Sequence, residues 1–241
     1  GPIRIGGHKI NDYRNNGPEL PVWQVITESS NLGTARIAKM IGPEKQRKFL
    51  SSLGFTKPTS IEMIEASGGK PLLPKRWNEL ETMTISYGHG LSATPLHLAT
   101  GYAALANGGR LVKPTLLERK KFDLGPQVIS KEVAENSLAM LRGVVTEGTA
   151  SLADVNGYFV AGKTGTADKP SAQGGYDKEK NITNFASIFP INEPKYVLVV
   201  TLDEPQDTSG PKPKRTAGWT AVPVSAEIIA RVAPLLGIRP K

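Results

Sequence analysis

Two short polar motifs, far apart in the sequence, hold the side chains best suited to chemistry. Ser29–Asn31 (SSN) precedes an apolar pattern with helical spacing, and Lys163–Thr166 (KTGT) follows an apolar pair. Their hydroxyl, amide and ammonium groups can donate hydrogen bonds and protons. Each motif alone has an ordinary explanation, as a helix N-cap or as an exposed strand edge with a bulge. Their joint occurrence, in this order and on these predicted types of element, indicates a functional site.

Other common active-site patterns are missing from the sequence. It contains no cysteine, and its three histidines, His8, His89 and His97, form no metal-binding spacing such as His-Glu-x-x-His. Gly88–Gly90 lacks the Lys-Ser/Thr continuation of a phosphate-binding loop, and no Gly-x-Ser-x-Gly elbow is present. We therefore expect neither a metal nor a cofactor, and we interpret His97 as a packed or surface side chain.

The composition is that of a basic globular protein. The chain has 241 residues, 39% of them hydrophobic, and a formal net charge of +8. Such a charge favours anionic partners, including carboxylate-bearing polymers. The basic residues form short clusters such as Lys45–Lys48 and Lys212–Arg215, with no aromatic residues between them. We interpret these clusters as solvated faces and expect no nucleic-acid partner. No apolar run approaches the roughly 20 residues that span a bilayer.

Apolar spacing and capping residues predict five helices. Thr94 is a typical N-cap before Pro95, and Ser130 precedes a helix in which Val133, Leu138, Leu141 and Val145 should be buried. Residues 56–81, which contain three prolines, are expected to be irregular. The predicted helices cover residues 32–41, 43–53, 95–105, 131–145 and a final segment around 228–235.

Three strand candidates follow the fourth helix, at residues 157–167, 182–191 and 195–204. The third is dense in β-branched residues, and the short connections favour an antiparallel sheet. Helices, then strands, then a final helix predict a layered α/β (α+β) fold.

Several strings identify a family once they are considered together. Ser-x-Asn with a downstream Lys-Thr-Gly belongs to the signature set of penicillin-binding proteins and serine β-lactamases. The strings "SSNLGTARIAK", "EGTASLA", "AGKTGTA" and "TAGWTAVPV" resemble the transpeptidase domain of class B penicillin-binding proteins. The resemblance is strongest to the division-type enzymes that cross-link septal peptidoglycan, and it extends from about Ile3 to the C-terminus. It implies the transpeptidase/β-lactamase-like fold, an antiparallel sheet flanked by helices.

The resemblance also implies a reaction, in which a serine attacks a D-Ala-D-Ala amide and the acyl-enzyme passes its acyl group to an amine. Lys163 would supply a positive field for the donor carboxylate, which the hydroxyls of Thr164 and Thr166 would bind. Gly165 would let the substrate backbone lie along the strand, and the Thr166 N–H would be one oxyanion donor. Ser29 would relay a proton and Asn31 would orient the peptide amide.

Partners and location follow from the same resemblance. The implied ligands are peptidoglycan stem peptides ending in D-Ala-D-Ala and β-lactams, and division proteins are implied partners. The implied place of work is the periplasmic face of the inner membrane, with a membrane anchor upstream of this chain.

The family's nucleophile, the serine of a Ser-x-x-Lys helix before Ser-x-Asn, has no counterpart here. No serine precedes Ser29. Ser209–Lys212, a Ser-x-x-Lys that comes after the Lys-Thr-Gly, lies in a proline-rich segment that cannot form the required helix. We therefore expect residues 1–241 to be the C-terminal part of one transpeptidase domain that begins after the nucleophile helix and the N-terminal strands. By itself it should be inactive, and Gly1-Pro2 fits the remnant of a cleaved tag.

Two alternatives stay open. A serine β-lactamase needs a base that hydrolyses the acyl-enzyme, and Glu62 or Glu65 lies at a plausible distance after Ser-x-Asn. The surrounding sequence, "IEMIEA", lacks the Glu-x-x-x-Asn pattern expected of that base. The other alternative is a catalytically dead, basic module that binds or scaffolds peptidoglycan, which the missing serine motif alone supports.

Overall fold

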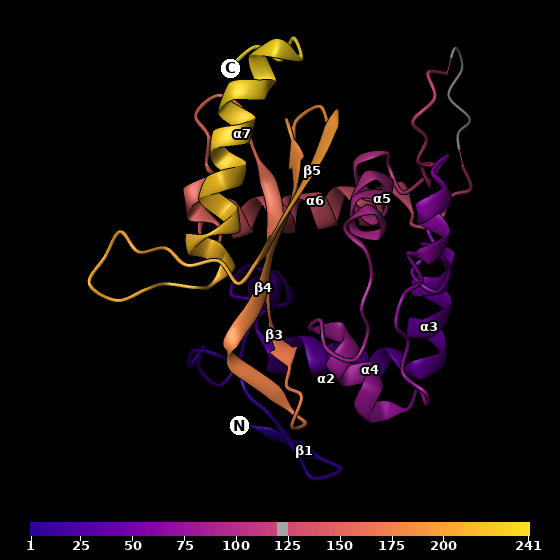
Figure 1. Ribbon diagram of the computed structural model, residues 1–241, viewed down its shortest axis with the longest axis vertical. Coiled ribbons are helices and arrows are strands. Elements are labelled where there is room, and N and C mark those ends of the chain that lie inside the picture. The colour runs from indigo at the N-terminus through magenta and orange to yellow at the C-terminus, as the bar shows by residue number, and fades with distance from the viewer. Residues whose placement is uncertain (120–124) are drawn as a thin grey trace. The chain divides into compact units, whose positions relative to one another are not determined.

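The computed structural model describes residues 1–119 and 125–241 (Figure 1). The chain folds as two compact units, residues 1–135 and 136–241. Helix α6 (Lys131–Thr146) contains the boundary between them. No helix in the described part of the chain is both long and apolar enough to cross a membrane.

The first unit is mainly helical. It begins with an antiparallel hairpin of β1 (Ile3–Ile5) and β2 (His8–Ile10), in which Arg4 pairs with Lys9. A small core of Ile10, Ala35 and Met83 joins this hairpin to two of the helices. The helices are α1 (Val22–Thr27), α2 (Asn31–Ile41), α3 (Pro43–Ser52), the 3₁₀ helix η1 (Ile64–Gly68), α4 (Glu79–Ser86) and α5 (Pro95–Ala106).

Most predicted helix boundaries in this unit are confirmed, and the capping residues explain why. Thr94 accepts a hydrogen bond from the His97 N–H, and Pro95 is the first residue of α5. Sequence reasoning missed α1, which has only six residues and no side-chain cap, and α4. Helix α4 begins inside the stretch predicted to be irregular. A signal for α4 was available, because Asn78 and Glu81 form a capping box at its start.

The second unit contains an antiparallel sheet in the order β3–β4–β5. Its strands are β3 (Ala161–Pro170), β4 (Tyr176–Phe189) and β5 (Tyr196–Asp203). All three predicted strands are present, but β3 begins four residues later and β4 six residues earlier than the sequence pattern indicated. Figure 1 shows α7 (Ala221–Leu235) lying along this sheet, and the short 3₁₀ helices η2 (Ser151–Ala153) and η3 (Ala217–Trp219) also pack in this unit. Among the described residues β3 is an edge strand, since its one partner in the sheet is β4.

The packing of the sheet depends on a close approach between β3 and β4. Phe185 is fully buried on β4, and its ring lies against the backbone of Gly162. A Cβ at position 162 would lie 2.5 Å from the Ala186 carbonyl oxygen and 2.7 Å from the Phe185 ring. Glycine at this position therefore lets the Phe185 ring pack closely against the backbone of β3.

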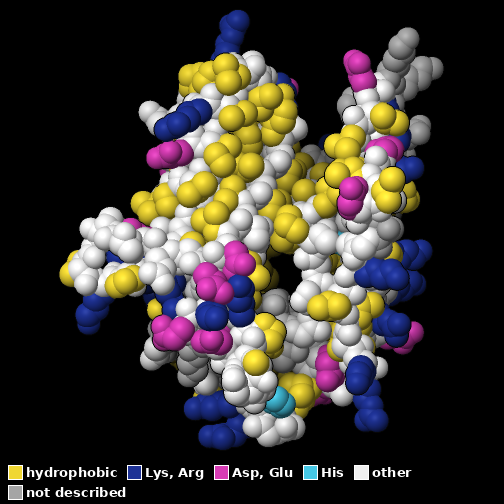
Figure 2. All heavy atoms as spheres, in the orientation of Figure 1, with side chains coloured by type: hydrophobic (Ala, Val, Ile, Leu, Met, Phe, Trp, Pro, Cys, Tyr) yellow, Lys and Arg dark blue, Asp and Glu magenta, His cyan; other side chains and the backbone are white. Residues whose placement is uncertain are grey.

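The burial prediction for α6 was wrong at Val133, and Leu138 is only partly buried. Val133 is 52% exposed, whereas Ala134 is fully buried and Leu141 and Val145 are buried. The inward stripe of the helix therefore starts one position later than the sequence pattern indicated. On the surface view, hydrophobic side chains gather over α7, where Leu235 is among the exposed apolar residues (Figure 2).

Candidate active site

The Ser29–Asn31 turn joins α1 to α2 in the first unit. Ser30, the middle residue, is the N-cap of α2, and its buried Oγ accepts a hydrogen bond of 2.9 Å from the Gly33 N–H. Ser29 adopts φ +57°, in the left-handed region that non-glycine residues rarely occupy. The ordinary capping role thus belongs to Ser30, and the turn presents Ser29 and Asn31 from a sharply bent backbone.

Asp12 braces this turn from the loop after β2. Its Oδ2 accepts a hydrogen bond of 2.8 Å from Ser30 Oγ, and its Oδ1 accepts one of 2.9 Å from the Leu32 N–H. The Asn31 amide also donates to the Asn11 carbonyl at 3.2 Å. Sequence reasoning missed Asp12, because no local motif marks a carboxylate that acts on residues 18 positions away.

Strand β3 presents Lys163–Thr166 at the edge of the sheet in the second unit. Thr164 pairs with Phe185 and Thr166 pairs with Thr183 on β4, so the two threonines alternate with Lys163 and Gly165 along the strand. Thr166 is exposed, whereas Thr164 is partly buried. The Ala217 N–H of η3 donates to Thr166 Oγ1 at 3.0 Å. Because that oxygen accepts from the backbone, its hydroxyl proton can be donated to a ligand.

Lys163 is held close to its own strand. Its Nζ donates to the Thr164 carbonyl oxygen at 3.1 Å and lies 3.5 Å from Thr164 Oγ1. Burial lowers the pKa of Lys163 to about 8, because a desolvated ammonium group is less stable than a hydrated one. The lysine is therefore still mostly protonated at neutral pH, and its charge lies in surroundings that screen it less than water does.

Thr149, which lies in the "EGTASLA" segment, supports the same strand. Its Oγ1 shares a hydrogen bond of 2.7 Å with Thr164 Oγ1. The Thr149 carbonyl oxygen also lies close to Gly218 of η3, since a Cβ added at position 218 would be 2.8 Å from this oxygen. One residue thus fixes Thr164 and contacts η3, whose Ala217 orients Thr166. Sequence reasoning used this segment as a family string and gave Thr149 no role.

Three other candidates from the sequence have structural explanations. Gly88 and Gly90 have φ values of +98° and +81°, which glycine adopts without strain. His97 is buried, with Nδ1 next to Thr94 and Nε2 2.8 Å from the Lys57 carbonyl, which confirms a packed histidine. Ser209 and Lys212 lie in a non-helical loop, as expected.

Glu62 is engaged by a distant loop. The Leu116 N–H donates to Oε2 at 3.0 Å, and Thr115 Oγ1 donates to Oε1 at 2.8 Å. These two hydrogen bonds lower the pKa of Glu62, since they stabilise the ionised carboxylate. A carboxylate held in this way is a weaker base, which argues against its assignment as the base of a β-lactamase.

Comparison with known proteins gives consistent matches over the whole chain. The family described as "Penicillin binding protein transpeptidase domain" matches residues 1–229. The probable peptidoglycan D,D-transpeptidase FtsI of Caulobacter vibrioides is 33% identical over 251 residues, covering 100% of this chain and 42% of its own length. The peptidoglycan D,D-transpeptidase FtsI of Escherichia coli K12 is 30% identical, with 99% and 40% covered. The chain therefore spans about two fifths of the length of these relatives.

Solved structures agree with the sequence matches. The transpeptidase domain of penicillin-binding protein 3 from Burkholderia pseudomallei superposes with a TM-score of 0.89 at 33% identity, covering 100% of this chain and 72% of that one. Penicillin-binding protein 3 from Mycobacterium tuberculosis, complexed with aztreonam, gives a TM-score of 0.87 at 28% identity, with 100% and 57% covered. These matches confirm the predicted fold class. The chain belongs to the penicillin-binding protein transpeptidase domain family, in its class B, FtsI-type branch.

Proposed function

We propose that this chain is the donor-binding part of a serine-type D,D-transpeptidase that cross-links peptidoglycan stem peptides during septal wall synthesis. The observation that carries the proposal is that β3 is an edge strand whose Lys163–Thr166 motif combines a partly buried lysine, Lys163, with an exposed hydroxyl, that of Thr166. An edge strand offers unpaired backbone groups, to which an extended peptide can add as a further strand. The proposed ligands are the D-Ala-D-Ala end of the stem peptide and β-lactams.

The proposed binding mode assigns a role to each residue of the motif. The Lys163 ammonium group supplies the positive field for the terminal carboxylate, and the Thr166 hydroxyl donates to it. Thr164, held by Thr149, contributes a second hydroxyl and keeps the strand in register. Gly165 leaves the strand face open, because even an added Cβ would meet Asn184 only at 3.7 Å.

In the proposed reaction a serine attacks the D-Ala-D-Ala amide carbonyl, the C–N bond breaks, and D-Ala leaves with a proton. The acyl group then passes to an amine of a second stem peptide. We assign the Thr166 N–H as one oxyanion donor, Ser29 as the proton relay and Asn31 as the group that orients the peptide amide. The nucleophilic serine would come from a segment of the parent protein outside these 241 residues, which would form the C-terminal part of one domain.

Several finer points of the proposal rest on the family resemblance of the sequence alone. The parent protein would work at the periplasmic face of the inner membrane, anchored upstream, together with other division proteins. The Caulobacter and Escherichia relatives are named peptidoglycan D,D-transpeptidases, and the Mycobacterium relative was solved with a β-lactam. These names support the substrate and ligand classes.

Labelling with a fluorescent penicillin tests the proposal. The 241-residue chain alone should form no covalent adduct, whereas the full-length protein should be labelled stoichiometrically. Lys163→Ala in the full-length protein should slow acylation by penicillin and by a D-Ala-D-Ala substrate. Unchanged acylation would refute the role of β3. Turnover of nitrocefin would instead identify a β-lactamase, and a full-length protein that is not labelled would favour a non-catalytic, wall-binding module.

A further inference from the structure

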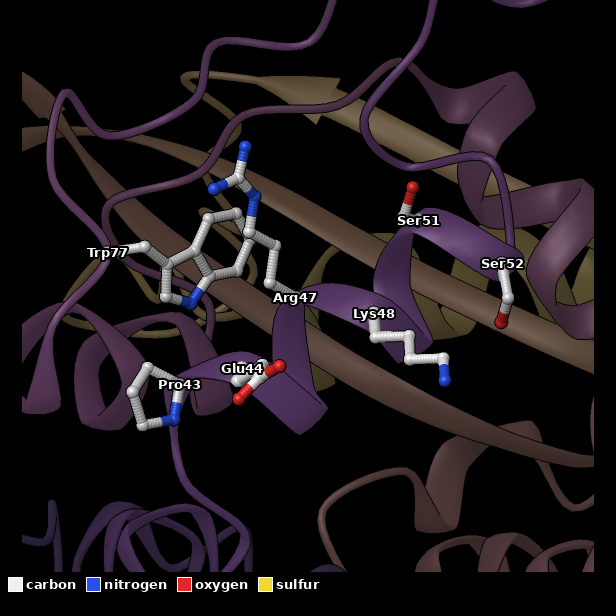
Figure 3. Close-up of a pocket in the computed structure, with 7 residues that line it drawn as sticks. All are labelled: Pro43, Glu44, Arg47, Lys48, Ser51, Ser52 and Trp77. Carbon is white, nitrogen blue, oxygen red and sulfur yellow. The ribbon is translucent and has the colours of Figure 1, made fainter.

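A groove in the first unit lies outside the motifs discussed above. It has a volume of about 760 Å³ and is formed by the outer face of α3 and by Trp77. Figure 3 shows Arg47 extending beside the Trp77 ring, with Lys48, Ser51 and Ser52 further along the helix. None of the α3 residues is fully buried, and Arg47, Lys48, Ser51 and Ser52 are exposed.

The cations around this groove form no ion pair in the described part of the chain. Arg47 and Lys48 line the groove, and Lys45 lies on the same helix. Within the described residues none of these cations takes part in an ion pair, nor do Lys75 and Arg76 directly before Trp77. Glu44 is the one carboxylate in the lining. On the surface view, Lys and Arg side chains gather over α3 (Figure 2). Clustered cations that fold without internal counter-charges create a field that attracts an anionic ligand.

The aromatic part of the groove is fixed before any ligand arrives. Trp77 Nε1 donates to Gln46 Oε1 at 2.9 Å, and Gln46 Nε2 donates to the Thr82 carbonyl at 2.8 Å. The Arg47 guanidinium lies 6.0 Å from the centre of the Trp77 ring, at the limit of a cation–π contact. A site whose side chains are already ordered loses less conformational entropy on binding.

We propose that this groove binds an anionic saccharide, namely a peptidoglycan glycan strand that has lost its stem peptides and therefore carries free lactyl carboxylates. A flat indole ring provides an apolar surface for the face of a sugar ring. Arg47 and Lys48 match carboxylates, and the Ser51 and Ser52 hydroxyls match sugar hydroxyls. Ser52 Oγ donates to the Phe49 carbonyl, so its oxygen is available as an acceptor. The inference rests on the proposed function and adds a contact with the glycan strand, separate from the stem-peptide site on β3.

The test measures binding of denuded peptidoglycan glycan, whose lactyl carboxylates are free, to the 241-residue chain by isothermal titration calorimetry. Neutral chitotetraose serves as the uncharged comparison. The Arg47→Ala/Lys48→Ala double variant should weaken glycan binding at least tenfold. The matched control, Arg4→Ala/Lys9→Ala, removes the same charge from exposed positions of the β1–β2 hairpin and should leave binding unchanged.

Three results would overturn the proposal. The first is an equal loss of glycan binding in both double variants, which would show unspecific charge attraction. The others are chitotetraose binding as tightly as the glycan, and an acidic peptide such as poly-glutamate displacing bound glycan more strongly than free glycan does. Penicillin labelling of the full-length Arg47→Ala/Lys48→Ala variant should stay normal. Lost glycan binding with normal labelling supports the groove, whereas a full-length protein that is never labelled contradicts the proposed function instead.

Discussion

Asp12→Ala removes the carboxylate that braces the Ser29–Asn31 turn, and its effect can be estimated from the structure. Two short hydrogen bonds are lost, at 2.8 Å from Ser30 Oγ and at 2.9 Å from the Leu32 N–H. Hydrogen bonds to a charged group contribute about 1.5–3 kcal/mol each. Asp12 is only partly buried, so water replaces part of this contribution. We expect the free energy of unfolding to fall by about 2–4 kcal/mol.

The loss is measured by urea unfolding of the chain and, in a separate experiment, by thermal melting. For a chain of this size, a loss of about 2–4 kcal/mol lowers the melting temperature by roughly 4–16 °C. Asp12→Asn keeps one acceptor oxygen and should recover part of the stability. The matched control, Asn16→Ala, removes only the long 3.3 Å contact to Asp12 Oδ2 and should change unfolding by less than about 0.5 kcal/mol.

The same variant also tests whether the brace matters for the chemistry. Ser29 already adopts a strained backbone conformation, which persists only when surrounding contacts hold it. In the full-length protein, Asp12→Ala should therefore slow acylation by fluorescent penicillin even at temperatures where the protein remains folded. If unfolding and acylation both match the wild type, Asp12 does not position this turn and the reasoning is wrong.

Three further predictions concern the sheet. Thr149→Val removes a hydrogen bond to β3 worth about 1 kcal/mol and should slow penicillin acylation of the full-length protein about three- to tenfold, whereas Thr149→Ser should restore the rate. The folded-state pKa of Lys163, about 8, lies below its ordinary value of 10.5, so the unfolded chain binds more protons between these values. The free energy of unfolding of the wild type, measured in urea relative to that of Lys163→Met, should therefore rise as the pH increases from about 8 to 10.5. A difference that stays flat or falls over this range would contradict the prediction. Gly162→Ala should destabilise the chain by about 1–3 kcal/mol or more in the same assay, because its Cβ would collide with the Phe185 ring. Gly165→Ala has room for the added methyl group and should unfold like the wild type; equal losses would show that the close approach is unimportant.

Local signals in the sequence determined much of the fold. Caps, glycine stops and apolar spacing predicted α2, α3, α5, α6 and α7, because each of these features acts over one or two helical turns. The β-branched run in β5 and the short connections predicted the antiparallel sheet. The motif pair predicted the family, since the order and types of chemical groups are properties of the sequence itself.

Only the tertiary structure decided how the motif residues are held. Ser30, not Ser29, is the N-cap of α2, and Thr166 is more exposed than Thr164. Each motif is held by a residue from elsewhere in the chain, the turn by Asp12 and the strand by Thr149. These supports are hydrogen bonds between residues 18 and 15 positions apart. Their partners meet only after helices and strands have packed, so no local periodicity or propensity encodes them. The lowered pKa of Lys163 has the same origin, because burial depends on what packs around the side chain.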